Sequence, residues 1–384
     1  EFTFQEGRWG EKIDELVANN GIVYVSAAGN TKALSWENVD SNNALVPFTP
    51  TAGTIVDVDG TTLIQNNFHE FRQVVGVPDF RQRISIDPKA ESFISLTWDD
   101  AHVPVALNGV DTDLDIFLVD PATNQVVAKG DSDNLATQLP YEVVSFENEN
   151  LTPVQLDVVI QHFAGPAPTK FKWTAFDNDL DILEADTASP TIIGHVAAQN
   201  ALAVGAVPYF NQSEVSPFTS LGPTTVLFDA DGNPLPIFDQ VRDKPDVAGI
   251  NGVDTSFFGS RDFDDTGFDN FFGTSASAPH VAAIAALVWQ TDPALTPAQV
   301  YQRLEQTAQN VVLPGELPNG WDPLSGFGLV DAFSAVFPSA PDVVNVSSLP
   351  GQIFTEDFES QRLEKYWEVN TQLGGVVETT SDNQ

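Results

Sequence analysis

The sequence of 384 residues contains no cysteine, which excludes disulfides, thiol redox chemistry and thiolate metal sites. Methionine is also absent, even at position 1, where the chain opens in mid-pattern with EFTF. We therefore expect a fragment or processed piece of a longer chain, and the lack of a signal peptide says nothing about export. Histidine occurs at only five positions, so few side chains are candidates for a general base near neutral pH.

Basic residues are scarce as well. Lysine and arginine number 16 against 54 aspartates and glutamates, which gives a formal net charge of -38. Such a surface repels phosphate and anionic lipid, so we expect no nucleic-acid partner and no membrane-surface partner. No apolar run approaches the ~18 residues of a membrane span. The acidic excess favours an extracellular, secreted or salt-adapted protein, and we expect a monomer.

Apolar residues are abundant enough to exclude a disordered chain. Hydrophobic residues make up 42% of the sequence, with 27 phenylalanines and 7 tryptophans, and disordered chains lack this much apolar surface. At roughly 150 residues per domain, the length predicts two to three domains. The chain is therefore expected to fold as a multidomain protein.

The sequence pattern changes twice along the chain. Residues 9–19 have helical spacing, Asn20-Gly21 is a helix stop, and residues 22–28 form an apolar run suited to a buried parallel strand, so this region predicts half of a βαβ unit. Residues 31–187 then predict short strands with turn signals between them, which is typical of a sandwich or jelly roll. These strands are expected over 92–98, 114–119, 125–128, 141–146, 154–163 and 171–176.

An α/β pattern returns at residue 188. A strand of small residues is expected over 201–207 and an alanine-rich helix over 275–290. A further helix is expected to begin after Thr296, because Gln299 completes a capping box. Residues 339–351 have the composition of a linker, and 352–384 are interpreted as the start of a truncated C-terminal module.

The strongest candidate for chemistry is Ser275, in the string GTSASAPHVAA at residues 273–283. The pattern places this serine at the N-terminus of a helix, where free amides and the helix dipole favour a developing oxyanion. The alternative from the residues alone is a buried alanine-rich helix with Ser275 as its N-cap.

Asn30 is the second candidate, in the string AAGN that ends the first predicted strand. The carboxyl end of a parallel strand faces the crevice where α/β proteins bind ligands. The Asn30 amide could there donate to an oxyanion beside the Ser275 N–H. The alternative is a simple strand-ending turn.

The string at 273–283 resembles the serine motif of the subtilisin-like serine peptidases, the subtilases (peptidase family S8), with Ala276 where methionine is common and Ala283 where glycine is usual. Further strings are similar to this family and occur in its order: AVGAV at 203–207, FTSLGP at 218–223, KPDVA at 244–248 and GFGLVDA at 326–332. The resemblance covers about residues 8–30 and 188–338.

The resemblance implies an α/β fold, with a mostly parallel subtilisin-like sheet and helices on both faces, interrupted by the all-β insert. Residues 1–30 and 188–338 would form a partial peptidase domain that lacks its N-terminal third, and 31–187 the inserted β-sandwich. The implied reaction is hydrolysis of peptide bonds in a protein or peptide substrate, through an acyl-enzyme on Ser275 with Asn30 in the oxyanion hole. No cofactor is required for that chemistry.

The sequence departs from the family pattern in the catalytic triad. The strings that carry the subtilase aspartate and histidine are absent. We expect all five histidines to be structural or solvated, the triad Asp and His to lie upstream of Glu1, and the fragment alone to be inactive. The alternative is a non-catalytic binding or adhesion protein on a degenerate subtilase scaffold.

The insert contains the string DTDLDIFL at 111–118, which looks like the β-sandwich modules that follow or interrupt secreted peptidases. Strand alternation places Asp111, Asp113 and Asp115 on the face opposite the aliphatic residues. Three carboxylates on one face repel each other unless they are solvated or bridged by a hard cation. Both interpretations stay open: a solvated edge, or a structural Ca²⁺ site at these three residues.

Overall fold

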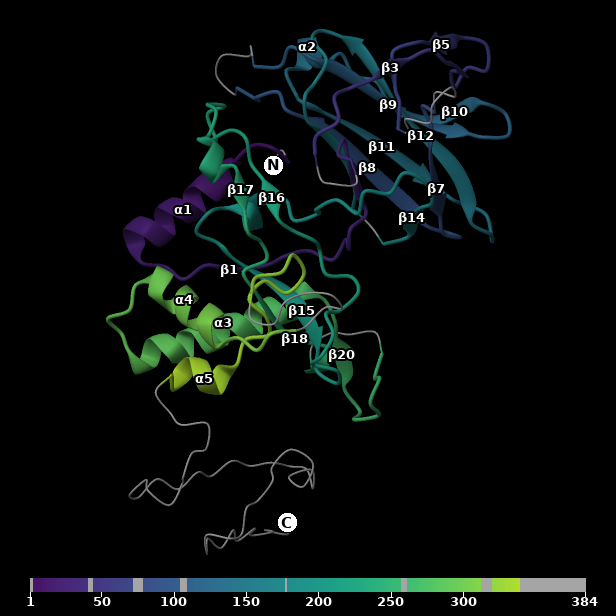
Figure 1. Ribbon diagram of the computed structural model, residues 1–384. Helices are drawn as coiled ribbons and strands as arrows, with labels where there is room; N and C mark the ends of the chain where they lie inside the picture. Colours follow the sequence, from purple (N-terminus) through teal and green to yellow (C-terminus); the bar gives the residue numbers. More distant parts are fainter. Residues whose placement is uncertain are drawn as a thin grey trace, which may run out of the picture. The chain divides into compact units, whose positions relative to one another are not determined.

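The computed structural model describes residues 3–40, 44–71, 79–103, 109–176, 178–256, 261–311 and 320–338 (Figure 1). Glu1–Val336 form one compact unit and Phe337–Gln384 a second one. The predicted linker at 339–351 and the predicted C-terminal module at 352–384 lie outside the described residues.

The α/β part is built on a parallel sheet in the order β1-β15-β18. Its strands are β1 (Val25–Ala27), β15 (Leu202–Pro208) and β18 (Val247–Asn251), and both pairings are parallel. The central strand β15 is buried over almost its whole length, as its run of small apolar residues predicts. The expectation of an α/β fold with a parallel sheet is confirmed.

Helices pack against this sheet and against each other. They are α1 (Arg8–Asn20), α3 (Thr274–Thr291), α4 (Pro297–Thr307) and α5 (Ala332–Val336), with 3₁₀ turns η1 (Gly194–Ala197) and η2 (Ile237–Asp239). The expected capping box at Thr296 and Gln299 is present. Helix α3 shares a buried core with β15, β18 and α4 through, among others, Leu202, Val204, Val247, Val281, Ala285, Val288, Val300 and Leu304.

The β-rich part consists of two sheets within the described residues. The larger runs β14-β7-β12-β9-β10-β4-β5, with β6 also paired to β12 and β3 paired to β6. Its strands are β3 (Pro50–Thr51), β4 (Thr54–Val56), β5 (Leu63–Gln65), β6 (Phe68–His69), β7 (Gln82–Ile86), β9 (Asp113–Asp120), β10 (Gln125–Gly130), β12 (Val154–Ala164) and β14 (Leu180–Ile182). A four-residue helix, α2 (Asn134–Thr137), follows β10.

The smaller sheet runs β11-β8-β13-β2. Its strands are β2 (Ser35–Glu37), β8 (Glu91–Trp98), β11 (Tyr141–Glu147) and β13 (Phe171–Ala175). One core cluster joins the two sheets, with Trp98 and Trp173 from the smaller sheet packed with Ile116 and Ile160 from the larger. This is a β-sandwich, as the sequence predicts.

The two ends of the β-rich segment lie side by side. The backbone N–H of Glu37 donates to the Thr187 hydroxyl at 3.1 Å, and the N–H of Ser189 donates to the carbonyl of Ser35 at 3.3 Å. A chain that enters and leaves at one place can be an insertion in a host domain. The domain boundaries at 31 and 187 stay a prediction.

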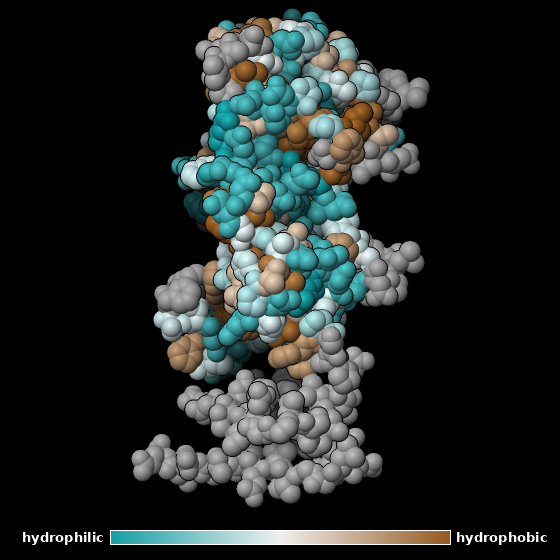
Figure 2. All heavy atoms as spheres, turned by 90° about the vertical axis from the view of Figure 1, so that its left-hand side faces the viewer, coloured by the Kyte–Doolittle hydropathy of each residue, from teal (hydrophilic) through white to brown (hydrophobic). Residues whose placement is uncertain are grey.

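Two short hairpins complete the described strands: β16 (Thr224–Thr225) pairs with β17 (Val241–Arg242), and β19 (Val253–Thr255) with β20 (Asp269–Phe271). In the part of the chain that the structure describes, no helix has the length and apolar character needed to cross a membrane. On the face shown in Figure 2, hydrophilic residues cover most of the described surface and hydrophobic residues form separate small patches.

Candidate active site

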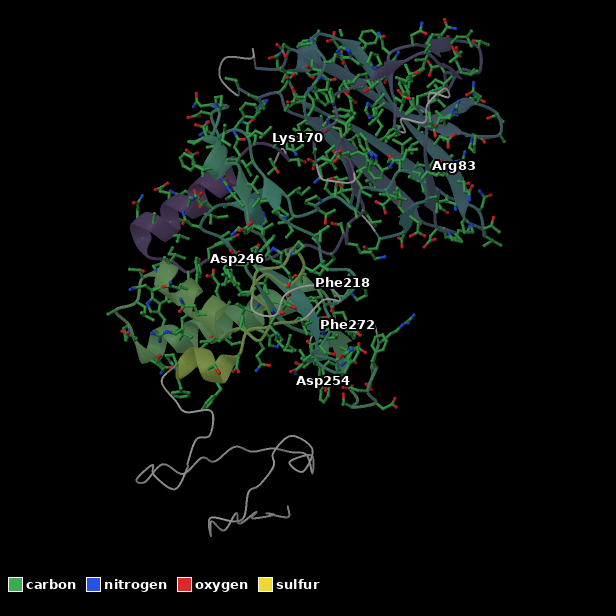
Figure 3. All side chains as sticks on the ribbon, in the orientation of Figure 1. Arg83, Lys170, Phe218, Asp246, Asp254 and Phe272 are labelled. Carbon is green, nitrogen blue, oxygen red and sulfur yellow. The ribbon has the colours of Figure 1, made fainter. Side chains whose placement is uncertain are left out.

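The candidate nucleophile Ser275 lies in the first turn of α3 and is exposed. Gly273, just before the helix, has φ 118° and ψ 159°, a conformation that only glycine adopts readily. The ring of Phe272, the residue before Gly273, lies against Gly252 and is labelled in Figure 3. Within the described residues the Ser275 hydroxyl and its backbone N–H have no hydrogen-bond partner. The hydroxyl is therefore accessible, and the amide is one of the free donors of a helix N-terminus.

Asn30 follows β1 in a loop that is fixed by neighbouring segments. The N–H of Gly29 donates to Thr274 Oγ1 at 3.2 Å, and the N–H of Thr31 donates to Ser220 Oγ at 3.2 Å. From the β-rich segment, Asn178 Nδ2 donates to the backbone carbonyl of Asn30 at 2.6 Å. The loop is thus held from three sides.

Thr274 fixes the orientation of the Asn30 side chain. Asn30 Oδ1 accepts hydrogen bonds from both the N–H and the hydroxyl of Thr274, each at 2.9 Å. Because the amide oxygen is occupied, the amide nitrogen Nδ2 is directed elsewhere, and no described group accepts a hydrogen bond from it.

The Asn30 amide and the Ser275 amide border the same small space. A Cβ atom placed on Gly273 would lie 3.3 Å from Asn30 Nδ2 and 3.7 Å from the backbone nitrogen of Ser275. Glycine at this position therefore keeps open a space next to the Asn30 side-chain nitrogen and the Ser275 backbone nitrogen, at the positive end of the α3 dipole. Paired donors next to a serine hydroxyl can stabilise the oxyanion of a tetrahedral intermediate.

The five histidines lie in different surroundings, and His280 is on the same helix as Ser275. His69 is buried among aromatic rings, and ring nitrogens of His102 and His280 lie 2.9 and 2.7 Å from the carbonyl oxygens of Gln138 and Ala276. His195 Nε2 lies 3.2 Å from Ser26 Oγ, and His162 Nε2 is buried without a partner. Among the described residues, no hydrogen bond joins a histidine to Ser275.

The KPDVA string forms a buried ion pair at the sheet. Lys244 Nζ lies 2.9 Å from Asp246 Oδ2 and also donates to the carbonyl of Ala201 at 2.5 Å, while the same carboxylate accepts the N–H of Ala203. Burial raises the pKa of Asp246, and Lys244 opposes this shift. Asp246, labelled in Figure 3, thereby ties the start of β18 to β15 and has a structural role.

The predicted metal ligands separate into one exposed and two buried residues. Asp111 is exposed before β9, whereas Asp113 and Asp115 are only 3% and 6% exposed. Strand β9 lies between β12 and β10 and not at the sheet edge, so these two carboxylates do not form a solvated edge. Burial raises the pKa of Asp115 to about 8, with a further contribution from Asp113.

In the described ranges, no group of three or more histidine, cysteine, aspartate or glutamate side chains is arranged to hold a metal ion. The Ca²⁺ site at Asp111, Asp113 and Asp115 therefore stays a prediction. The sequence interpretation also missed two residues of the serine site. Thr274 could have been suspected from its place beside Ser275, whereas nothing in the sequence connects Asn178 with Asn30.

Several known proteins are similar to part of this chain. The model of the subtilase family (Peptidase_S8) matches residues 171–328. Mycosin-4 of Mycobacterium tuberculosis is 44% identical over 82 residues, which is 21% of this chain and 17% of that protein. Mycosin-1 of Mycolicibacterium smegmatis is 43% identical over 70 residues, 18% of this chain and 14% of that protein.

Solved structures are similar as well. The Clostridium perfringens CspB protease matches with a TM-score of 0.46 and 14% identity, over 87% of this chain and 64% of that one. MycP1 with its N-terminal propeptide removed matches with a TM-score of 0.22 and 28% identity, over 37% of this chain and 38% of that one.

A helix that begins with an exposed serine, beside the side-chain amide of an asparagine that follows β1, is an arrangement that can support acyl transfer. The matched segment, residues 171–328, is less than half of the chain, and it is similar to the subtilase family. The matched part spans less than a fifth of the length of the curated relatives, 17% of Mycosin-4.

Proposed function

We propose that this protein is a serine endopeptidase that hydrolyses peptide bonds through an acyl-enzyme on Ser275. The observation that carries the proposal is the space beside Gly273, which the Asn30 side-chain amide and the Ser275 backbone amide both border. Such a pair of donors has no evident structural purpose, since neither N–H has a partner among the described residues.

In the proposed mechanism Ser275 Oγ attacks the carbonyl carbon of the scissile bond while a base takes the hydroxyl proton. The negative charge that develops on the carbonyl oxygen is stabilised by Asn30 Nδ2 and the Ser275 N–H. The proton then passes to the leaving amine, the C–N bond breaks, and water hydrolyses the remaining ester by the same steps. No cofactor takes part in this sequence.

The base and its orienting carboxylate are proposed to come from residues that this sequence does not contain. The five histidines have other contacts, as described above. In subtilisin, a member of the subtilase family, loss of the serine or histidine lowers kcat about 2 × 10⁶-fold. We therefore expect the purified chain not to hydrolyse casein, and casein hydrolysis that Ser275→Ala abolishes would show that the chain has its own base.

The substrate is proposed to be a protein or peptide, met outside the cell by a monomeric enzyme. The support for this location is the net charge of -38, which is typical of extracellular or salt-adapted proteins.

The oxyanion site can be tested on the chain itself by acylation with N-acetylimidazole. In this reaction the serine oxygen attacks the acetyl carbon, and imidazole leaves with the serine proton, so no protein base is needed. Mass spectrometry of proteolytic peptides measures the acetylation rate at Ser275 and at Ser213, an exposed serine in a loop. We expect Ser275 to react about tenfold faster or more, because paired donors stabilise its oxyanion.

Asn30→Leu is the matched variant, since it removes one donor and keeps the side-chain volume. It should bring the Ser275 rate close to that of Ser213. Equal rates at the two serines in the parent chain would contradict the proposal and would favour a binding protein on a degenerate scaffold.

A further inference from the structure

Two buried carboxylates lie at the start of β9, where strand alternation places them opposite Leu114 and Ile116 of the core between the sheets. Asp113 and Asp115 are 3% and 6% exposed, and alternate residues of a strand share a face. The segment after β10 reaches this place, because Gly130 pairs with Ile116 and Asp131 comes next. The backbone amide of Asn134, the first residue of α2, lies near the carboxylate of Asp113.

Two oxygens at this place are buried and have no hydrogen-bond partner: Oδ1 of Asp113 and Oδ1 of Asn134. The orientation of the Asn134 amide is fixed, since its Nδ2 donates to Glu142 Oε1 at 2.9 Å and to the carbonyls of Leu139 and Tyr141. Buried oxygens without a donor are rare in folded proteins and call for an explanation such as a bound ion.

The charged groups around Asp113 and Asp115 do not neutralise the negative charge of these two carboxylates. Asp131, Asp133 and Glu142 add negative charge, and Glu142 is itself buried. Two basic side chains, Lys129 and His162, face these carboxylates. Lys129 is bound to Asp131 at 2.8 Å and to Asp57 at 3.3 Å, and His162 faces Asp113.

We propose that Asp113 and Asp115 bind a Ca²⁺ ion between the start of β9 and the segment that joins β10 to α2, with the Asn134 amide oxygen and water molecules as further ligands. Ca²⁺ takes six to eight oxygen ligands, including amide oxygens and waters, in flexible geometry. This donor set contains oxygen only, as Ca²⁺ prefers. It also replaces the exposed Asp111 of the sequence interpretation by an asparagine from a second segment.

The described carboxylates alone do not form a ready group of three ligands, so the shell is completed by the amide oxygen and by water. A cavity of about 250 Å³ opens beside the segment, and Asp131, Asn134 and Glu142 all line it.

The proposal is tested on the 384-residue chain after removal of divalent ions with EGTA. Calorimetric titration with CaCl₂ should show one site per chain, and thermal unfolding at 100-fold excess over Kd should move Tm upward by about 5 °C. Asp113→Asn and Asp115→Asn should each weaken binding at least about tenfold. Asp131→Asn, at an exposed position, should weaken binding through the loss of a nearby negative charge, without affecting the fold.

The metal-free Tm separates ligation from a purely structural effect. Without Ca²⁺ the two buried variants should be as stable as the parent or more stable, because each removes a charge from a buried like-charged pair. Asp181→Asn, at an exposed position on β14, is the matched control and should keep full Ca²⁺ binding. The proposal is overturned if Ca²⁺ gives neither heat nor a Tm shift, if it binds both buried variants as well as the parent, or if Mg²⁺ at equal concentration gives the same response.

Discussion

Asn30 and Thr274, which are 244 positions apart, are joined by two hydrogen bonds to a single oxygen: Asn30 Oδ1 accepts both the N–H and the hydroxyl of Thr274 at 2.9 Å. An asparagine amide rotates freely unless one end is fixed. Because the oxygen is fixed toward the helix, the nitrogen is directed at the space beside Gly273. Thr274 is thus a positioning residue for the proposed oxyanion donor.

Thr274→Val should slow the acetylation of Ser275 without displacing the helix. Valine keeps the shape and the backbone N–H but removes one of the two bonds to Asn30 and the acceptor of the Gly29 N–H, and a hydrogen bond contributes about 1 kcal/mol. We expect a rate about fivefold lower in the N-acetylimidazole assay. Thr291→Val at the other end of α3 removes a hydroxyl that bonds only to its own helix, so it should leave the rate unchanged.

Gly273→Ala should abolish the selective acetylation of Ser275. The new methyl group would stand between the two donors, 3.3 Å from Asn30 Nδ2, in a backbone conformation that alanine tolerates poorly. Gly267→Ala is the control, because Gly267 also has a positive φ but no atom lies within 4 Å of its added Cβ. Both variants should lose stability in urea unfolding, by about 1–2 kcal/mol. A Gly273→Ala protein that still acetylates selectively would mean that the space is not the oxyanion site.

Asn178→Ala tests whether the β-rich segment supports the serine site. Its side chain is exposed and donates to the carbonyl of Asn30 at 2.6 Å. Removing this bond should lower the Ser275 acetylation rate while the thermal midpoint stays within about 1 °C, since exposed substitutions change stability by only about 0.5 kcal/mol. Asn233→Ala, in a loop that does not contact Asn30, is a suitable comparison. An unchanged rate would leave the β-rich segment without a part in orienting Asn30.

The secondary structure near the site was predictable because its signals are local. Gly21 ends α1 in the left-handed conformation, and Thr296 and Gln299 form the expected capping box, each within a few residues of the helix that it limits. Ser275 likewise was placed at a helix N-terminus from the neighbouring glycine and the small residues that follow.

Contacts between distant segments were not predictable in this way. Asp113 and Asp115 have the spacing of a half-exposed strand, and their burial depends on β12 and on the segment after β10. The Asn134 oxygen and the Asn178 contact likewise depend on tertiary neighbours, because asparagine is as common in plain turns. Composition and spacing do not reveal which strand covers a carboxylate.

Buried His69 should make stability depend on pH. Its ring lies among Trp36, Phe48 and Phe171, and burial lowers its pKa from 6.5 to about 3. The unfolded chain therefore takes up a proton below pH 6.5 that the folded chain does not bind until about pH 3. Stability should be lost as pH falls through this window, by about 5 kcal/mol at most.

The measurement is urea unfolding of the parent and of His69→Phe from pH 7 to pH 4. The phenylalanine variant should lose less stability than the parent over this range, because it has no proton to gain. Phe48→Leu, in the same aromatic cluster, should lower stability equally at every pH. Parallel curves for the parent and His69→Phe would show that this histidine does not contribute.

Residues 31–187 should fold without the rest of the chain. Their two sheets enclose a core with Trp98 and Trp173 fully buried, and their ends meet where Glu37 bonds to Thr187 at 3.1 Å. A segment of this size with its own core is expected to unfold as one cooperative unit. Thermal unfolding of the isolated segment, followed by near-ultraviolet circular dichroism of its tryptophans, should give one sharp transition.

Trp173→Ala should strongly lower the midpoint of this transition, since loss of a buried tryptophan costs about 3–5 kcal/mol. Leu151→Ala, at an 83% exposed position, should leave the midpoint unchanged. A gradual change in the parent segment would mean that the sandwich depends on the α/β sheet for its fold.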